Sequence, residues 1–327
     1  MTQSPPEPAA APPSPAGRPL LILAADHRAS LERDLYDLTV PATPAQAARI
    51  SADKMLIYQA LLDAVEYLPD AVQAGVLIDE AYGAGVAELA SRTGGEISLA
   101  MPIEASGQEW FHFAYGQDWQ AHAEFFATDH AKVLVRDNPG LDQDRRAGQA
   151  ERLAHVSDWA AAKGRALIIE LLVPARQADL AALDGDTARY DRDVRPELTV
   201  TAIEYLQEHG VNPAMWEVEG LDRHDAAVAV AAVAKRGGRT ADCIVLGRHA
   251  SHARLDHWLQ VAAPVPGFTG FAIGRSIWWD PLHARLHHRS TAREARSRIA
   301  STYLDFARYY LEAREGELGS RPGPEFW

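Results

Sequence analysis

Eight short apolar segments recur along this chain of 327 residues, separated by stretches long enough for a helix. A continuous apolar run of strand length is typical of a parallel strand that is buried on both faces. The eight runs cover residues 20–25, 75–78, 97–101, 132–135, 166–173, 215–218, 243–246 and 268–273. Their regular recurrence indicates a repeated strand–helix architecture.

The stretches between these runs show helical spacing of apolar residues. The clearest helical stretches are 44–66, 145–163, 196–208, 223–235 and 291–314. Eight strands that alternate with about eight helices predict an α/β protein with a single (β/α)8 TIM barrel. A doubly wound open sheet is the alternative, but the GxGxxG turn that would favour it follows none of the runs.

We predict one barrel domain over residues 19–315. Residues 1–18 are mainly Pro, Ala and Ser, which cannot repay the entropy of ordering, so we expect a disordered tail there. Residues 316–327 are expected to form a C-terminal tail. The stretch 174–194, between the fifth run and its helix, is long enough to form a lid or a substrate wall.

Charge and cysteine content restrict the partners and the compartment. The chain carries 32 Lys and Arg against 45 Asp and Glu, a net charge of −13, which argues against nonspecific binding to nucleic acid or to an anionic membrane. Cys243 is the single cysteine, so an internal disulfide is excluded and a reducing, cytoplasmic setting is favoured. No apolar run approaches the roughly 20 residues of a membrane span. We expect a homo-oligomer with a small-molecule substrate.

In a barrel the active site forms where the strands end, so polar residues that close the runs are the candidate site residues. His27, Arg28 and Glu80 adjoin the first two strand ends and are candidate substrate ligands. Lys132 and Arg136 alternate along one face of the fourth run; if that face is the lumen, they require carboxylate partners. Glu170 lies inside an apolar run, which indicates function or a buried ion pair.

Two glycine–arginine pairs predict an anion site. Gly247 and Arg248 follow the seventh run, and Gly274 and Arg275 follow the eighth. Barrels commonly bind phosphate after these two strands, because glycine lets the ligand approach backbone N–H groups and arginine adds a fork of donors. The chain can therefore hold a small anionic substrate despite its negative net charge.

Several motifs together resemble a known family. They are ADHR at 25–28, LIDEAYG at 77–83, KVLV at 132–135, IIELL at 168–172 and GFAIGRSIWW at 270–279. Over residues 20–312 the chain resembles the aldolase-like domain at the C-terminal end of some inositol-catabolism sugar kinases, of the 2-deoxy-5-keto-gluconate-6-phosphate aldolase type. It is similar, more distantly, to the tagatose-bisphosphate and sulfofructose-phosphate class I aldolases.

The resemblance implies a Schiff base between a lysine on the sixth strand and a ketose phosphate. The supporting Asp, Lys and Glu of those aldolases match Asp26, Lys132 and Glu170, and their phosphate-binding arginine matches Arg275. The match breaks on the sixth strand, where Glu217 stands at the position expected for the lysine. A glutamate cannot supply the amine that a Schiff base needs.

Three functions follow as alternatives. The preferred one is a carbon–carbon lyase that acts on a phosphorylated sugar or sugar acid in carbohydrate or inositol catabolism, without cofactor or metal. Lys132 would be its Schiff-base amine, and Glu170 or Glu217 its proton shuttle. The second is a metal-assisted isomerase, epimerase or lyase, although no compact metal motif such as HExxH is present. The third is a sugar-phosphate-binding barrel without catalysis, which the loss of the sixth-strand lysine favours.

The surroundings of Lys132 discriminate between these functions. Buried carboxylates in the lumen need a cation, so we expect Lys132 within hydrogen-bonding reach of Glu170 or Glu217. Such pairing favours the ammonium form and raises the pKa of the lysine. A strongly paired Lys132 therefore argues against a Schiff base at this residue.

Overall fold

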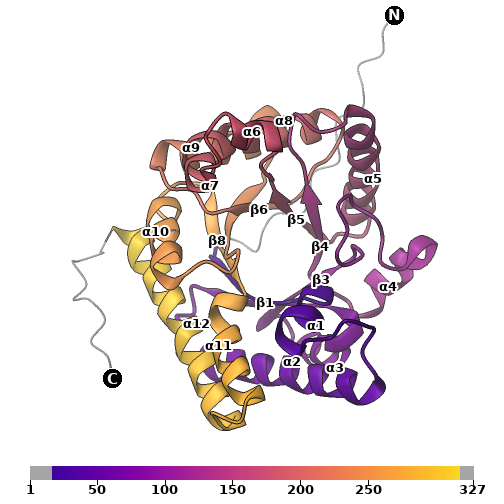
Figure 1. Cartoon of the computed structure of the whole chain (residues 1–327), viewed down its shortest axis with the longest axis vertical. Helices are drawn as coiled ribbons and strands as arrows, with labels where there is room; N and C mark the ends of the chain where they lie inside the picture. Colours follow the sequence, from indigo (N-terminus) through magenta and orange to yellow (C-terminus); the bar gives the residue numbers. More distant parts are fainter. Residues whose placement is uncertain (1–16, 317–327) are drawn as a thin grey trace, which may run out of the picture.

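Eight parallel strands close into a barrel in sequence order, with β8 paired to β1 (Figure 1). The computed structural model describes residues 17–316, so nearly all of the tails predicted at 1–18 and 316–327 lies outside the described residues. The strands are β1 Leu20–Ala25, β2 Gln73–Ile78, β3 Ile97–Pro102, β4 His130–Arg136, β5 Ala166–Leu172, β6 Met215–Glu219, β7 Asp242–Leu246 and β8 Phe268–Ile273. This confirms the predicted (β/α)8 TIM barrel and excludes the open sheet.

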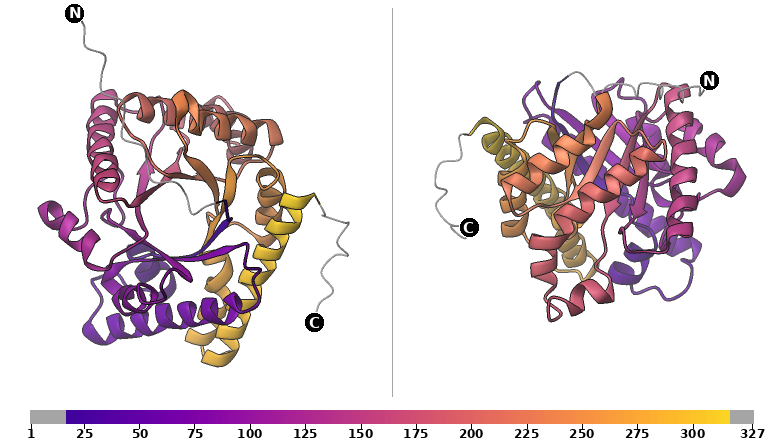
Figure 2. Two further views of the ribbon diagram at one scale, coloured as in Figure 1. Left: turned by 180° about the vertical axis from the view of Figure 1, so that it is seen from behind. Right: turned by 90° about the horizontal axis from the view of Figure 1, so that it is seen from above.

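Helices surround the strands on all sides (Figures 1 and 2). They are α1 Ala29–Tyr36, α2 Pro44–Val65, α3 Glu80–Ala90, α4 Trp119–Phe125, α5 Gln143–Ala162, α6 Gln177–Ala181, α7 Thr187–Arg189, α8 Arg195–Glu208, α9 His224–Ala234, α10 His252–Ala262, α11 Arg275–Leu286 and α12 Ala292–Glu315. Short helical turns lie at Gly116–Asp118, Tyr190–Val194 and Arg236–Gly238. Within residues 17–316 no helix is both long and apolar enough to cross a membrane.

The two longest helices begin at strong local signals. Thr43 and Gln46 form a capping box at the start of α2, where Pro44 takes the first helical position. Thr291 and Glu294 form a second capping box at the start of α12. These two helices pack against each other, and α12 also packs against α10 and α11, so the last helix closes the outer ring next to the first strands.

The barrel has an inner and an outer core. The outer core lies between the strands and the helices, and the inner core fills the lumen. The inner core consists of Leu20, Ile22, Ala24, Leu77, Ala100, Ile168, Met215, Ile244 and Ala272. Its members near the carboxyl ends of β1 and β8 are the small Ala24 and Ala272, and both line a cavity above the core. Small side chains at this level leave room for a ligand.

The seam between β8 and β1 depends on Gly270. Its φ of 153° and its register opposite Leu20 bring the two backbones so close that a Cβ at this position would overlap the Leu20 carbonyl. We expect Gly270→Ala to lower the free energy of unfolding by about 2–4 kcal/mol, because a closed barrel cannot widen at one seam alone. Urea denaturation measures this effect.

The matched control is Gly148→Ala, in the middle of α5. A Cβ there meets nothing closer than the Arg152 side chain at 3.6 Å. Because alanine is the better helix former, this variant should be as stable as the wild type or more stable, by up to about 1 kcal/mol. Equal stability of the two variants would contradict the close approach at the seam.

Candidate active site

A cavity of about 540 Å³ opens at the carboxyl ends of the strands. This volume is ordinary for a pocket that holds one small ligand. The sequence-predicted residues that line it are Asp26, His27, Arg28, Lys132, Glu170, Glu217, Arg248, Gly274 and Arg275. They come from six of the eight strands or from the turns that follow them, so residues far apart in the sequence meet at one site.

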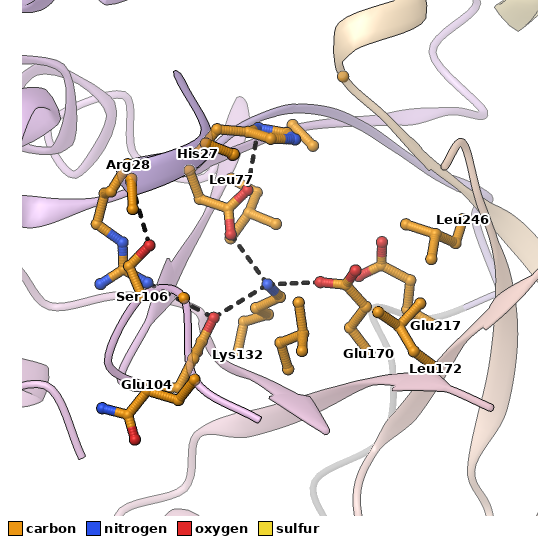
Figure 3. A pocket seen from close by; sticks show the side chains of 18 of the residues that line it. His27, Arg28, Leu77, Glu104, Ser106, Lys132, Glu170, Leu172, Glu217 and Leu246 are labelled. Carbon is orange, nitrogen blue, oxygen red and sulfur yellow. Dashed lines mark hydrogen bonds and ion pairs between the residues drawn. The ribbon is translucent and has the colours of Figure 1, made fainter. Parts of the chain in front are cut away.

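Lys132 lies among three carboxylates. Its Nζ is 2.9 Å from Asp26 Oδ2, 3.2 Å from Glu104 Oε1 and 2.6 Å from Glu170 Oε2. Figure 3 shows Lys132 between Glu104 and Glu170, with Glu217 beside Glu170. An ammonium group has three N–H donors, so protein carboxylates occupy all of them.

Strand register explains this convergence. Lys132 pairs with Pro102 of β3, two residues before Glu104, and Leu134 pairs with Glu170 of β5. Glu170 in turn pairs directly with Glu217 of β6. Because residues two apart on a strand face the same side, the predicted alternation holds, and Lys132, Leu134 and Arg136 all line the cavity.

The electrostatics keep Lys132 charged. Burial alone would lower the pKa of Lys132, but the carboxylates of Asp26, Glu104 and Glu170 outweigh burial and hold the pKa well above its usual value. Burial alone would raise the pKa of Asp26, but the charge of Lys132 and its hydrogen bond to Asp26 reverse that effect and lower the pKa. Lys132 therefore has no lone pair at neutral pH with which to attack a carbonyl group.

Glu217 is in the opposite electrostatic situation. Its residue is 1% exposed, and its Oε2 has no hydrogen-bond partner. Burial raises the pKa of Glu217, and the neighbouring Glu170 raises it further, against the opposing effect of Lys132. Glu217 therefore tends to hold a proton under conditions in which an exposed glutamate has lost it.

The raised pKa of Glu217 predicts that the effect of Glu217→Gln on the free energy of unfolding depends on pH. The folded chain keeps a proton on Glu217 that the unfolded chain releases above its ordinary pKa of 4.5. Stability from this group is therefore lost as pH rises through the folded pKa. Glutamine cannot ionise, so the variant should gain stability relative to the wild type as pH rises from 5 to 9, by about 1 kcal/mol or more.

Urea denaturation at several pH values measures this gain, and Glu151→Gln on the exposed face of α5 is the control. The control should show a difference from the wild type that does not change with pH. A constant difference for Glu217→Gln as well would contradict the raised pKa.

Arg275 is a free cation of the cavity wall. It makes no ion pair with any residue in the described part of the chain, and its Nε is buried without a partner. Arg248, by contrast, is engaged, 2.7 Å from Glu219 Oε1 and 3.3 Å from Asp191 Oδ1. Of the two predicted arginines, Arg275 is therefore the one that is ready to bind an anion.

Imidazole groups line the same side of the cavity. Burial lowers the pKa of His27 to about 3, so this ring is neutral, and its Nδ1 has no hydrogen-bond partner. Arg248 and His249 both adopt a left-handed backbone, with φ of 46° and 54°. Consecutive non-glycine residues in this region store strain, which often accompanies a functional site.

The structure does not bring two predicted residues to the cavity wall. Glu80 is the first residue of α3, and its carboxylate lies 2.9 Å from His122 Nδ1. Asp79 caps α3 by accepting from the Tyr82 backbone N–H, and this turn directs Glu80 away from the lumen. Gly247 is also not among the lining residues, although its neighbour Arg248 is.

The predicted lid is a second correction. No residue of 174–194 lines the cavity; this segment forms α6, α7 and the turn at Tyr190–Val194. The wall comes instead from residues 104–111 after β3. Glu104 and Phe113 form an isolated antiparallel bridge, and Ser106 Oγ accepts from the Ala29 N–H at 3.3 Å, so this loop is fixed to α1.

Sequence reasoning also missed the roles of two charged groups. Glu104, two residues beyond β3, is a partner of Lys132, and its Oε2 is buried without a hydrogen bond. Lys54 on α2 forms a buried ion pair with Asp79 and donates to the His27 carbonyl at 2.8 Å. Lys54 does not line the cavity, so it positions the turn after β1.

The described residues do not provide a metal centre. Within 17–316, no group of three or more His, Cys, Asp or Glu side chains is arranged to hold a metal ion. Three carboxylates near the strand ends, those of Asp26, Glu104 and Glu170, surround Lys132.

Comparisons with known proteins agree with this architecture. A family model described as "Uncharacterized protein conserved in bacteria (DUF2090)" matches residues 11–314. Among solved structures, the chain is similar to fructose-bisphosphate aldolase from Plasmodium falciparum in complex with TRAP and a small-molecule inhibitor. The TM-score is 0.63 at 11% identity, over 96% of this chain and 93% of that chain. No curated protein matches the sequence significantly.

Two further structures show the same fold. A Schiff-base-forming fructose-1,6-bisphosphate aldolase matches with a TM-score of 0.50 and 15% identity, over 89% of this chain and 96% of that chain. A structural-genomics target from Corynebacterium glutamicum matches with a TM-score of 0.50 and 18% identity, over 89% and 88%. At such identities the likeness shows the fold alone, which is an aldolase-like TIM barrel.

Proposed function

Since this chain belongs to the bacterial family described as DUF2090, and its barrel is aldolase-like, we propose that it is a carbon–carbon lyase without a Schiff base. Its substrate is a phosphorylated sugar or sugar acid. The observation that carries the proposal is Lys132, whose three donors are held by Asp26, Glu104 and Glu170 inside the cavity. A charged lysine among carboxylates supports acid–base chemistry rather than nucleophilic attack.

The phosphate end of the substrate binds at Arg275. The unpaired guanidinium supports this assignment, as does its place at the start of α11, directly after β8. Backbone N–H groups at a helix start add to the attraction for an anion. The carbonyl end then extends across the lumen toward Lys132 and its carboxylates.

The proposed reaction is a retro-aldol cleavage. Glu170 takes the proton from the hydroxyl group β to the substrate carbonyl, and the bond between the α and β carbons breaks. The β carbon leaves as an aldehyde, and the bonding electron pair moves to the carbonyl oxygen as an enediolate, which the neutral His27 stabilises by donating a hydrogen bond. Glu170 then returns the proton to the α carbon, so two carbonyl fragments leave and the enzyme is unchanged.

The remaining residues of the cluster keep this arrangement in place. Lys132 fixes the carboxylates that surround it, and Asp26 joins it to the turn that carries His27. Glu217 lies opposite Glu170 and sets its electrostatic environment. We place the reaction in cytoplasmic carbohydrate catabolism, with inositol catabolism as the branch that the sequence resemblance implies, and with a homo-oligomer as the working unit.

Arg275→Ala tests the anion site. Loss of the free guanidinium should weaken the binding of a phosphorylated sugar by on the order of 1.5–3 kcal/mol, the scale of hydrogen bonds to charged groups. Arg248→Ala should weaken it less, because Glu219 and Asp191 already hold that side chain. Isothermal titration calorimetry measures both. Equal affinity of Arg275→Ala and the wild type would refute the assignment.

Product analysis tests the reaction itself. The protein is incubated with a panel of phosphorylated ketoses and keto sugar acids, with and without borohydride, and the products and peptides are analysed by mass spectrometry. We expect carbonyl fragments from at least one substrate and no reduced adduct on Lys132. An adduct on Lys132 would restore the Schiff-base mechanism.

Glu170→Gln separates catalysis from binding in this assay. It should lower the rate of fragment formation by roughly 10²–10⁴-fold, the usual contribution of a general base, while phosphosugar binding persists. Binding without fragments across the whole panel would instead support the second candidate, a sugar-phosphate-binding barrel. The observation in favour of that candidate is Glu217 at the position where the resemblance leads one to expect a lysine.

A further inference from the structure

The cavity is lined by four carboxyl groups and six lysine or arginine side chains, yet one of the carboxyl groups has no ion-pair partner within residues 17–316. Asp26, Glu104 and Glu170 share the ammonium of Lys132, and Arg28 approaches Glu104 at 3.7 Å. Glu217 lies outside this set: it makes no ion pair within residues 17–316, and its Oε2 is buried without a hydrogen bond. One carboxyl group of the wall is therefore left for a ligand.

The surroundings of Glu217 favour a cation as its partner. On the β5 side it faces Glu170 in direct register, and on the β7 side it faces the apolar Ile244. Figure 3 shows Leu172 and Leu246 beside the two glutamates. Two adjacent carboxyl groups against an apolar wall attract a compact cation strongly, because few water molecules compete there.

A proton is the simplest such cation, and solvent supplies it when no ligand is bound. The charged groups that act on Glu217 are Glu170, Lys132, Asp26 and Glu104, and together with burial they favour the neutral acid. An ammonium group on the substrate would serve better than a proton. It can donate to Glu217 while also lying beside Glu170, and it would let Glu217 ionise.

Cationic side chains line the cavity where β8 pairs with β1. Arg275, at the start of α11, lines the cavity without an ion-pair partner in residues 17–316, and Arg28 and Arg33 after β1 also line it. Arg136 also lacks an ion pair there, but it donates a hydrogen bond to the Gln108 carbonyl at 2.8 Å. A ligand with an anionic group and a cationic group would match Arg275 and Glu217 together. This complementarity gives orientation as well as affinity.

We propose that the substrate is an amino sugar phosphate, whose ammonium group lies on Glu217 beside Glu170 while its phosphate lies on Arg275. The proposal rests on the proposed phosphosugar function and names its substrate class. The primary amine distinguishes this class from the hydroxyl-bearing sugars of the same size and charge at the phosphate.

Calorimetry with matched probes tests the amine. The pairs are D-glucosamine 6-phosphate against D-glucose 6-phosphate, and D-galactosamine 6-phosphate against D-galactose 6-phosphate, which differ only in one amino or hydroxyl group. At least one amine should bind tenfold or more tightly than its hydroxyl partner. Glu217→Gln should reduce that preference to less than threefold, and Glu151→Gln on the surface should leave it unchanged.

Proton release provides a readout that needs no variant. If the ammonium replaces the proton of Glu217, binding of the amine at pH 7 should release up to about one proton, measured from the binding enthalpy in buffers of different ionisation enthalpy. The hydroxyl partner should release none. Equal proton release by both members of a pair would overturn the proposal even if Glu217→Gln failed to fold.

Arg275→Ala distinguishes a failure of the amine proposal from a failure of the phosphosugar function. If amine and hydroxyl sugars bind equally and Arg275→Ala weakens both, the amine is wrong and the phosphosugar function stands. If neither member of either pair binds, or if Arg275→Ala changes nothing, the phosphosugar function fails and the amine proposal fails with it.

Discussion

The ammonium of Lys132 is the interaction on which the candidate site depends. Asp26, Glu104 and Glu170 come from three different strand ends, and each would be strongly disfavoured in the lumen as an unpaired charge. One buried cation with three donors satisfies all three carboxylates and fixes their positions relative to one another. The loop after β3 is part of this arrangement, because Glu104 also forms the bridge to Phe113 that shapes the cavity wall.

The fold could be predicted from the sequence because each strand of a closed parallel barrel has a characteristic composition. Its strands are buried on both faces, so they appear in the sequence as apolar runs. Two of the eight strands, β1 and β8, begin and end at the predicted residues. The lumen-facing side of β4 was equally readable, since period-two alternation placed Lys132 with Leu134 and Arg136. The rule that polar residues at strand ends form the site then identified most of the charged lining residues, but not Arg33 or Glu104.

What the sequence could not supply was the direction of the connections between strands. Glu104 lies beyond the end of β3, on a bridge that leaves no periodic signal. Glu80 follows the same strand-end rule as Asp26, yet the cap formed by Asp79 turns it toward His122 instead. The length of 174–194 indicated a lid, but that segment reaches the cavity only indirectly, through the contact of Asp191 with Arg248. Loop length therefore did not reveal which loop bends inward.

Glu217 would give this site a different chemistry from that of a lysine at the same position. The resemblance to class I aldolases implies a lysine here, close to Lys132. Two ammonium groups at short range repel each other. One of them therefore loses its proton more easily and becomes a neutral amine, which is a nucleophile. In this chain Glu217 faces Glu170, and two carboxylates at short range also repel each other. One of them then takes up a proton and becomes neutral.

The same like-charge repulsion thus yields a neutral group at the same place on β6, but with opposite reactivity. A neutral carboxyl group cannot form a Schiff base; it can donate a proton, or exchange that proton for a cation of the ligand. Under the proposed function, this position recognises the substrate by its charge, whereas a lysine here would attack the carbon skeleton. Lys132 cannot take over the attack, because the carboxylates that make it indispensable to the site also keep it protonated.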